Sequence, residues 1–349
     1  MLLLLISWTV MVGSSAQATM EIVRNNKQKA FKKTIPAGNY SGIAWLGDNK
    51  YAVVTDKSDH DGFFVLQIDI DSVTAKILDA RILGFYSSQL PNRDAEGIAY
   101  LPESETLLIS GESGNDIIEY QMDGQLTGRK VDVPEIFHAS TSNYGLESLS
   151  YNPSTRRLWT CSESTIPFDG PQASSTNRVM NRIRVQSFDA SLHPLAQYAY
   201  QMDEPKAHKR SVNFAMGVSE LCALDDGSLL VLEREFRVPK LKIGSYVINK
   251  IYQVFPDREE TIESDKPLSD DSPYMTKYLL AKWRTRLNIT ARSIANYEGM
   301  CLGPRLAGGS QSIILVADSQ NRYKGVLKDW LKTLIIKPAD NQQSNVNDY

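Results

Sequence analysis

The chain has 349 residues, of which 42% are hydrophobic and 23% are charged, and its formal net charge is −3. Such a chain can bury a sizeable core, as one large domain or as two ordinary ones. The slightly acidic balance argues against a broad basic surface for nucleic acid or a membrane.

The N-terminus reads "MLLLLISWTVMVGSSAQATM". An apolar run from Leu2 to Val12 is followed by Ala16-Gln17-Ala18, the small-x-small pattern of a cleavage site. We therefore expect a signal peptide over residues 1–18 and a protein exported to the periplasm or the extracellular space after cleavage near Ala18. No Lys or Arg precedes the apolar run, so a buried hydrophobic segment is the alternative. No later stretch is long and apolar enough to span a bilayer.

A short hairpin pattern recurs along the chain. The stretch "DAEGIAYLPESETLLISGES" (94–113) has a polar residue, a small or apolar tetrad, a turn and an apolar run that ends at an acid. Recurrence at matched positions predicts a structural repeat. The other copies are "YSGIAWLGDNKYAVVTDKS" (40–58), "GLESLSYNPSTRRLWTCSES" (145–164), "VSELCALDDGSLLVLERE" (218–235) and "YEGMCLGPRLAGGSQSIILVADSQ" (297–320).

Two sets of residues define the repeat. We name them the leading residues, which open each hairpin, and the closing acids, which end it. The leading residues are Ser41, Glu96, Glu147, Glu220 and Glu298. The closing acids are Asp56, Glu112, Glu163, Glu233 and Asp318.

Each hairpin is followed by two further strand-like runs, as in "DIIEYQMDGQLTGRKVDV" with its turn at Asp123-Gly124. Four-stranded units of about 40–50 residues are typical of β-propeller blades. We therefore predict an all-β fold, a single propeller domain over residues 19–338 and a disordered tail over 339–349. Five blades are readable. A sixth is possible if "EIVRNNKQKAFKKTI" and "LKTLIIKPA" pair to close the ring.

The first strand of each blade is expected to line the central channel, where period-2 alternation would turn the leading glutamates away from the packed side chains. Two polar insertions, 164–181 and 256–275, are expected to be loops over one face. Loops of this kind carry function more often than strands do.

The motifs "DAEGIAY", "GLESLSYNP", "SELCALDDGSLLVLERE" and "NYEGMCLGPRLAGG", with "ILVADSQN" after the last, resemble those of the phytase-like family, described as esterase-like activity of phytase. They occur in the family's order and span roughly residues 40–325. The resemblance implies an exported, propeller-like protein with repeated acids and phosphoester hydrolysis as its activity. Ser41 departs from the pattern, because glutamate is expected there.

Several ionised carboxylates on one axis repel each other unless a divalent cation binds or some keep a proton. Calcium suits such a ring because it takes 6 to 8 oxygen ligands, and magnesium is the second choice. We predict metal ligands at Glu96, Glu147, Glu220, Glu298 and Asp56. Catalytic roles are predicted for the acids Glu112, Glu163, Glu233 and Asp318. The structural alternative is that these acids accept loop hydrogen bonds and hold the blades in register.

Phosphate binding also needs cations, and Arg is a better fork for phosphate than Lys. The candidates lie near the acidic motifs: Arg93, Arg178, Arg234, Arg322 and Lys324. Arg93 and Arg234 each stand beside an acid, so ordinary ion pairs are the alternative interpretation.

Two classes of function follow from these patterns. The first is a monomeric, calcium-dependent phosphoric ester hydrolase that acts on a small phosphorylated substrate. The second is a propeller without chemistry that binds a ligand or a protein through its insertions, with calcium in a structural role.

Overall fold

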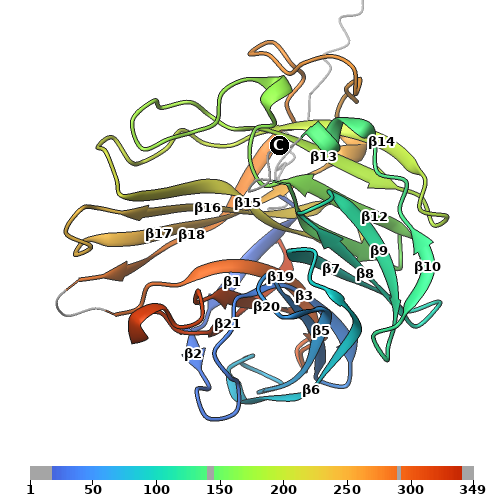
Figure 1. Ribbon diagram of the computed structural model, residues 1–349, viewed down its shortest axis with the longest axis vertical. Coiled ribbons are helices and arrows are strands. Elements are labelled where there is room, and N and C mark those ends of the chain that lie inside the picture. Colours follow the sequence, from blue (N-terminus) through green and yellow to red (C-terminus); the bar gives the residue numbers. More distant parts are fainter. Residues whose placement is uncertain (1–17, 140–144, 289–291, 340–349) are drawn as a thin grey trace, which may run out of the picture.

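The computed structural model describes residues 18–139, 145–288 and 292–339. Its long elements are all β-strands, arranged in five antiparallel sheets around a common centre (Figure 1). The fold is the predicted β-propeller, and each sheet is a blade. Residues 1–17 and 340–349 lie outside the described residues, and so do most of the predicted signal peptide and most of the predicted tail.

Four blades are built from consecutive strands. Blade I has β3 (Tyr40–Gly47), β4 (Lys50–Thr55), β5 (His60–Ile70) and β6 (Ile77–Pro91). Blade II has β7 (Ala95–Leu101), β8 (Thr106–Gly111), β9 (Asp116–Gln121) and β10 (Leu126–Lys130). Blade III has β11 (Leu146–Asn152), β12 (Arg157–Ser162), β13 (Arg182–Phe188) and β14 (Pro194–Gln201). Blade IV has β15 (Asn213–Ala223), β16 (Leu229–Val238), β17 (Ser245–Val254) and β18 (Lys277–Leu287).

Blade V joins the two ends of the propeller. It has β19 (Asn296–Arg305), β20 (Gln311–Asp318) and β21 (Trp330–Pro338) from the C-terminal part, and β1 (Met20–Asn25) as its outer strand. The short β2 (Lys29–Ala30) also pairs with β21. The N- and C-terminal segments therefore pair as the sequence allowed, but they complete the fifth blade. They do not form a sixth.

The innermost strands of the blades surround the axis. β3 contacts β7, β7 contacts β11, β11 contacts β15, β15 contacts β19, and β19 contacts β3. This closed ring puts the first strand of each repeat at the channel, as predicted. Neighbouring innermost strands approach each other closely, because a Cβ on Gly299 would clash with the Ser41 carbonyl oxygen of the neighbouring blade.

Turn residues fix the hairpins. In the β3–β4 turn, Asp48 and Asn49 have φ of 45° and 60°, the left-handed pair that a two-residue hairpin of type I′ requires. The predicted turn at Asp123-Gly124 is present, and Gly124 has φ of 89°. Four short 3₁₀ helices lie in the connections: η1 (Glu135–Ala139), η2 (Pro167–Asp169), η3 (Pro256–Arg258) and η4 (Tyr323–Gly325).

The hydrophobic core is divided among the five spaces between neighbouring blades. Trp159 and Tyr200 of blade III pack with Val231 of blade IV, for example. Complete burial of a large apolar side chain contributes about 1.5–3 kcal/mol to stability, so these interfaces hold the ring together and keep the polar axis in place. Among the described residues, we find no helix with the length and hydrophobicity needed to cross a membrane.

Candidate functional site

An acidic pocket of about 260 Å³ lies at the end of the axis where the innermost strands begin. We call it the acid pocket. Only two of the side chains that line it are cationic, Lys57 and Arg234. The eight carboxylates that line it are Asp56, Asp94, Glu96, Glu112, Glu147, Glu163, Glu298 and Asp318. Seven of the nine acids predicted from the repeat therefore meet here.

A β-bulge positions the leading residue in every blade. The pairing of each innermost strand with the next strand shifts at this point, for example between Leu146 and Ser148 of β11 and between Tyr297 and Gly299 of β19. A bulge re-aims the extra side chain out of the alternating pattern. Glu147 and Glu298 are these extra residues, and the shift in β7 spans Glu96.

The same pairing corrects the alignment of the fourth repeat. In β15 the shift lies between Val218 and Glu220, so Ser219 holds the leading position. At the other end of the hairpin, Glu233 pairs with Val218, just as Ser162 pairs with Leu146 in blade III. The closing position of blade IV is therefore taken by Arg234. Our sequence alignment was one residue out of register in this repeat.

Glu220 is consequently not part of the acid pocket. Its side chain is 1% exposed, and its Oε1 accepts backbone N–H bonds from Leu149 of blade III at 3.1 Å and from Leu221 at 3.0 Å. Burial raises its pKa well above the usual range. Its Oε2 has no hydrogen-bond partner. Glu220 thus joins the innermost strands of two blades as a structural acid.

Glu233 also lies away from the pocket, on the opposite face of β16. It accepts hydrogen bonds from the Tyr200 hydroxyl at 2.7 Å and from the Lys277 ammonium at 2.8 Å. Both partners lie at the interface of blades III and IV. The predicted catalytic role of Glu233 therefore has no support in its position, which is that of a buried ion-pair acceptor.

Arg234 stands among the acids of the pocket. Its guanidinium nitrogens lie 2.5 Å from Glu163, 2.9 Å from Glu298 and 3.8 Å from Glu147. It also donates to the Asn296 side chain at 2.7 Å. Burial lowers the pKa of Arg234, but the three carboxylates more than offset this, so the guanidinium stays charged.

Within the acid pocket, three carboxylates form a cluster between blades I and II. Carboxylate oxygens of Asp56, Asp94 and Glu96 lie within 4.8 Å of one another. The ammonium of Lys57 lies 3.0 Å from Asp56 and 2.7 Å from Asp94, and its side chain is 60% exposed. The Asp56 Oδ1 is buried and has no hydrogen-bond partner. These three carboxylates offer the hard oxygen ligands that a divalent cation prefers, and one of their oxygens, Asp56 Oδ1, has no other partner.

Sequence reasoning missed Asp94 and Lys57. Asp94 stands two residues before Glu96, where the equivalent residue of the next blade is Gly145. At Gly145 there is no side chain, and the closing acid of blade II, Glu112, lies against the backbone there and accepts the Gly145 N–H at 2.8 Å. Asp94 instead brings a third carboxylate to Asp56. Asp94 is visible in "NRDAEG", but the sequence does not show that it contacts Asp56 of the neighbouring blade.

Burial raises the pKa of most acids in the pocket. The pKa rises to about 7 at Glu112 and at Asp318. It rises well above the usual range at Glu96, Glu147 and Glu298, where burial is the largest cause and neighbouring carboxylates add to it. A hydrogen bond from Ser41, the leading residue of blade I, partly opposes the rise at Glu96.

The other predicted phosphate-binding cations lie elsewhere. Arg93 is paired with Asp61 of blade I at 2.7 Å and with Asp116 of blade II. Arg178 forms an exposed pair with Glu204 at 2.5 Å. Arg322 is paired with Asp329 at 2.5 Å, and the side chain of Lys324 lies outside the described residues.

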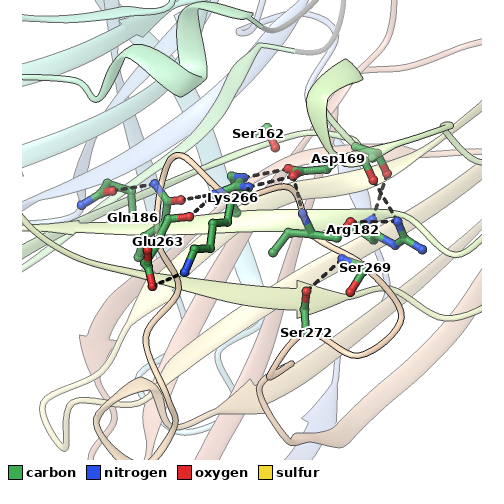
Figure 2. A network of polar contacts seen from close by, with 12 residues as sticks. Ser162, Asp169, Arg182, Gln186, Glu263, Lys266, Ser269 and Ser272 are labelled. Atoms are coloured by element: carbon green, nitrogen blue, oxygen red, sulfur yellow. Dashed lines mark hydrogen bonds and ion pairs between the residues drawn. The ribbon is translucent and has the colours of Figure 1, made fainter.

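The two polar insertions bind each other. Arg184 of β13 is fully buried and pairs with Asp169 of the first insertion at 2.7 Å. The Asp169 carboxylate also accepts the Leu268 N–H of the second insertion, and Arg184 donates to the Lys266 carbonyl (Figure 2). The Met275 N–H of the second insertion also donates to the Ala199 carbonyl of β14. The second insertion therefore covers the edge of β14. We call this contact the insertion clamp.

The chain is similar to several solved structures. Solved structures with similar folds include streptogramin B lyase (13% identity, 90% of this chain and 98% of the other, TM-score 0.38) and the Swd1 β-propeller domain from Myceliophteria thermophila (10%, 90% and 99%, 0.35). A gluconolactonase from Xanthomonas campestris is similar too (9%, 93% and 99%, 0.34). No curated protein matches the chain.

The sequence profile of one family covers the acid pocket and all five hairpins. It is described as phytase-like, esterase-like activity of phytase, and it matches residues 35–320. The match runs from just before blade I to just after the closing acid Asp318. The chain therefore belongs to the phytase-like family.

Proposed function

We propose that this protein is an exported, calcium-dependent phosphoric ester hydrolase that acts at the acid pocket. The observation that carries the proposal is the cluster of Asp56, Asp94 and Glu96, with its buried and unpartnered Asp56 oxygen. These residues would hold the cation, and magnesium is the second choice because it demands tighter octahedral geometry.

Charge explains why a metal is needed. A phosphate group that entered a pocket with eight carboxylates would meet only Lys57 and Arg234 as protein cations. Arg234 is already paired with three glutamates. Calcium at the Asp56 cluster would supply positive charge for a phosphoryl oxygen and would lower the pKa of bound water.

The remaining acids have separate tasks in this proposal. With a pKa of about 7, Glu112 and Asp318 can accept or return a proton near neutral pH, as a general base must. The exposed ammonium of Lys57 can turn from Asp56 to a substrate phosphate. Glu147, Glu163 and Glu298 hold Arg234 in place. The substrate would be a small phosphorylated molecule, and the protein would act as a monomer.

Hydrolysis assays test the proposal. The mature protein from Thr19 is given p-nitrophenyl phosphate and bis(p-nitrophenyl) phosphate with calcium, with magnesium and with EDTA. We expect turnover with calcium, loss in EDTA, and loss in Asp94→Asn and Glu96→Gln. Asp79→Asn is the matched control, because Asp79 is exposed on β6 away from the pocket. Turnover that persists in EDTA or in Glu96→Gln would refute the assignment.

A propeller that binds calcium without chemistry is the second candidate. The paired state of Arg234 favours it, since this guanidinium is not free to clamp phosphate. In that case calcium would raise the melting temperature by mass action, and neither ester would be cleaved with any metal.

A further inference from the structure

A second charged pocket, of about 330 Å³, lies beside blade IV. Its walls are the loop that precedes β15, through Lys206, His208 and Lys209, and the blade itself, through Arg237 of β16, Tyr246 of β17 and Arg284 of β18. We call it the basic pocket. Its character is opposite to that of the acid pocket, although the chain as a whole is slightly acidic.

Neighbouring residues of β16 face the two pockets. Arg234 and Phe236 line the acid pocket, whereas Arg237 lines the basic pocket. Successive side chains of a strand point to opposite faces. The strand therefore separates the two sites, and a ligand of the basic pocket is held without help from the calcium ligands proposed above.

The cations of the basic pocket have no acidic partners in the described part of the chain. Lys206, Lys209, Arg237 and Arg284 form no ion pair there. Arg93 and Arg322, by contrast, each form an ion pair with an aspartate. Like charges gathered without a counterion repel one another, so the arrangement is favourable when an anion occupies it.

Glu235, a buried acid of β16, already accepts hydrogen bonds from the walls of the basic pocket. Glu235 is 5% exposed, and it accepts the backbone N–H groups of Lys206 at 2.7 Å and Ala207 at 2.8 Å. It also accepts the Tyr246 hydroxyl at 2.8 Å. Glu235 thus fixes the loop and the tyrosine as walls of the pocket, and within the described residues it forms no ion pair with Arg237 or Arg284.

The two arginines are held for binding. The Arg284 guanidinium lies over the Tyr246 ring, 4.6 Å from its centroid. The Nε of Arg237 is buried and has no hydrogen-bond partner. A half-buried guanidinium that lacks a partner can donate to a ligand, and the planar fork of Arg matches the oxygens of phosphate and sulfate.

We propose that the basic pocket binds a doubly charged tetrahedral oxyanion, the phosphate or sulfate group of a small molecule. Arg237 and Arg284 contact its oxygens, while Lys206 and Lys209 add long-range attraction from the exposed loop. This proposal does not rest on the proposed hydrolysis, because the pocket lies on the other side of β16.

Isothermal titration calorimetry with sodium phosphate and with sodium sulfate tests it. The mature protein is titrated in EDTA at constant ionic strength, so that no divalent cation can bring phosphate to the acid pocket. We expect saturable binding of both anions, about tenfold weaker in Arg237→Gln and in Arg284→Gln. Lys282→Gln is the matched control, since Lys282 is exposed on β18 and does not line the pocket. It should bind as the wild type does.

Two results would overturn the proposal. One is the absence of saturable heat for either anion in the wild-type protein. The other is unchanged affinity in Arg284→Gln, whose exposed side chain can be replaced without disturbing the fold. Because EDTA is present throughout, neither result bears on calcium-dependent hydrolysis.

Discussion

Arg234 and Glu163 hold the same closing position in neighbouring blades, and they pair with each other at 2.5 Å in the acid pocket. The repeat thus places a cation where its other four copies place an acid. This substitution neutralises part of the negative charge that the ring symmetry would otherwise concentrate. It also ties blade III to blade IV at the axis, and through Glu298 it reaches blade V.

Replacement of Arg234 should therefore destabilise the metal-free protein. Arg234→Met leaves Glu147, Glu163 and Glu298 without their shared cation, and loss of one partner from a buried ion pair costs about 3–5 kcal/mol. Thermal unfolding in EDTA measures the effect. Arg178→Met, which breaks an exposed pair, should leave the melting temperature close to that of the wild type. Equal losses in the two variants would contradict a central role for Arg234.

Stability without metal should fall as the pH rises. Burial raises the pKa of Glu112 and Asp318 to about 7, so between about pH 4 and pH 7 the folded protein holds protons that the unfolded chain releases. The stability that these protons provide is complete below the unfolded pKa and is lost as the pH passes the folded one. Melting temperatures in EDTA from about pH 5 to about pH 8 show whether stability falls as the pH rises. An increase over this range would contradict it.

The repeat made most of the fold predictable. Turn residues such as Asp123 and Gly124, and the alternating apolar runs, indicated four strands per unit, because both are local properties of the chain. The closing of the ring was less certain from sequence, since the pairing of β1 with β21 joins segments more than 300 residues apart.

The site was predicted less completely, and the fourth repeat shows why. Both "VSEL" and "LERE" place an acid one residue from the position that faces the pocket. A shift of one residue moves every side chain of a strand to the other face. Only the bulge between Val218 and Glu220 decides the register. Asp94 was missed for a different reason, because its partner Asp56 lies in another blade.

The corrected register yields a direct comparison of two acids. Asp94→Asn removes a ligand of the proposed cation site and should weaken calcium binding about tenfold or more. Glu220→Gln should leave it unchanged, because Glu220 does not line the acid pocket and binds the backbone of blade III instead. Calorimetric titration with calcium distinguishes them. A large loss in Glu220→Gln would restore that residue to the metal site.

The insertion clamp gives the last prediction. Asp169→Asn keeps the shape of the side chain but leaves the fully buried Arg184 guanidinium without its counterion, at a cost of about 3–5 kcal/mol. The matched control is Asp270→Asn in the second insertion, which removes the 87% exposed partner of Arg182 and should cost less than about 1 kcal/mol.

Limited proteolysis and thermal unfolding measure both variants of this pair. Asp169→Asn should expose residues 164–181 and 256–275 to cleavage before the rest of the propeller, because the two insertions hold each other against β14 through this carboxylate. Calcium affinity should stay at the wild-type value, since the clamp lies away from the residues that line the acid pocket. If Asp169→Asn and Asp270→Asn were cleaved alike, the buried pair would not be what orders the insertions.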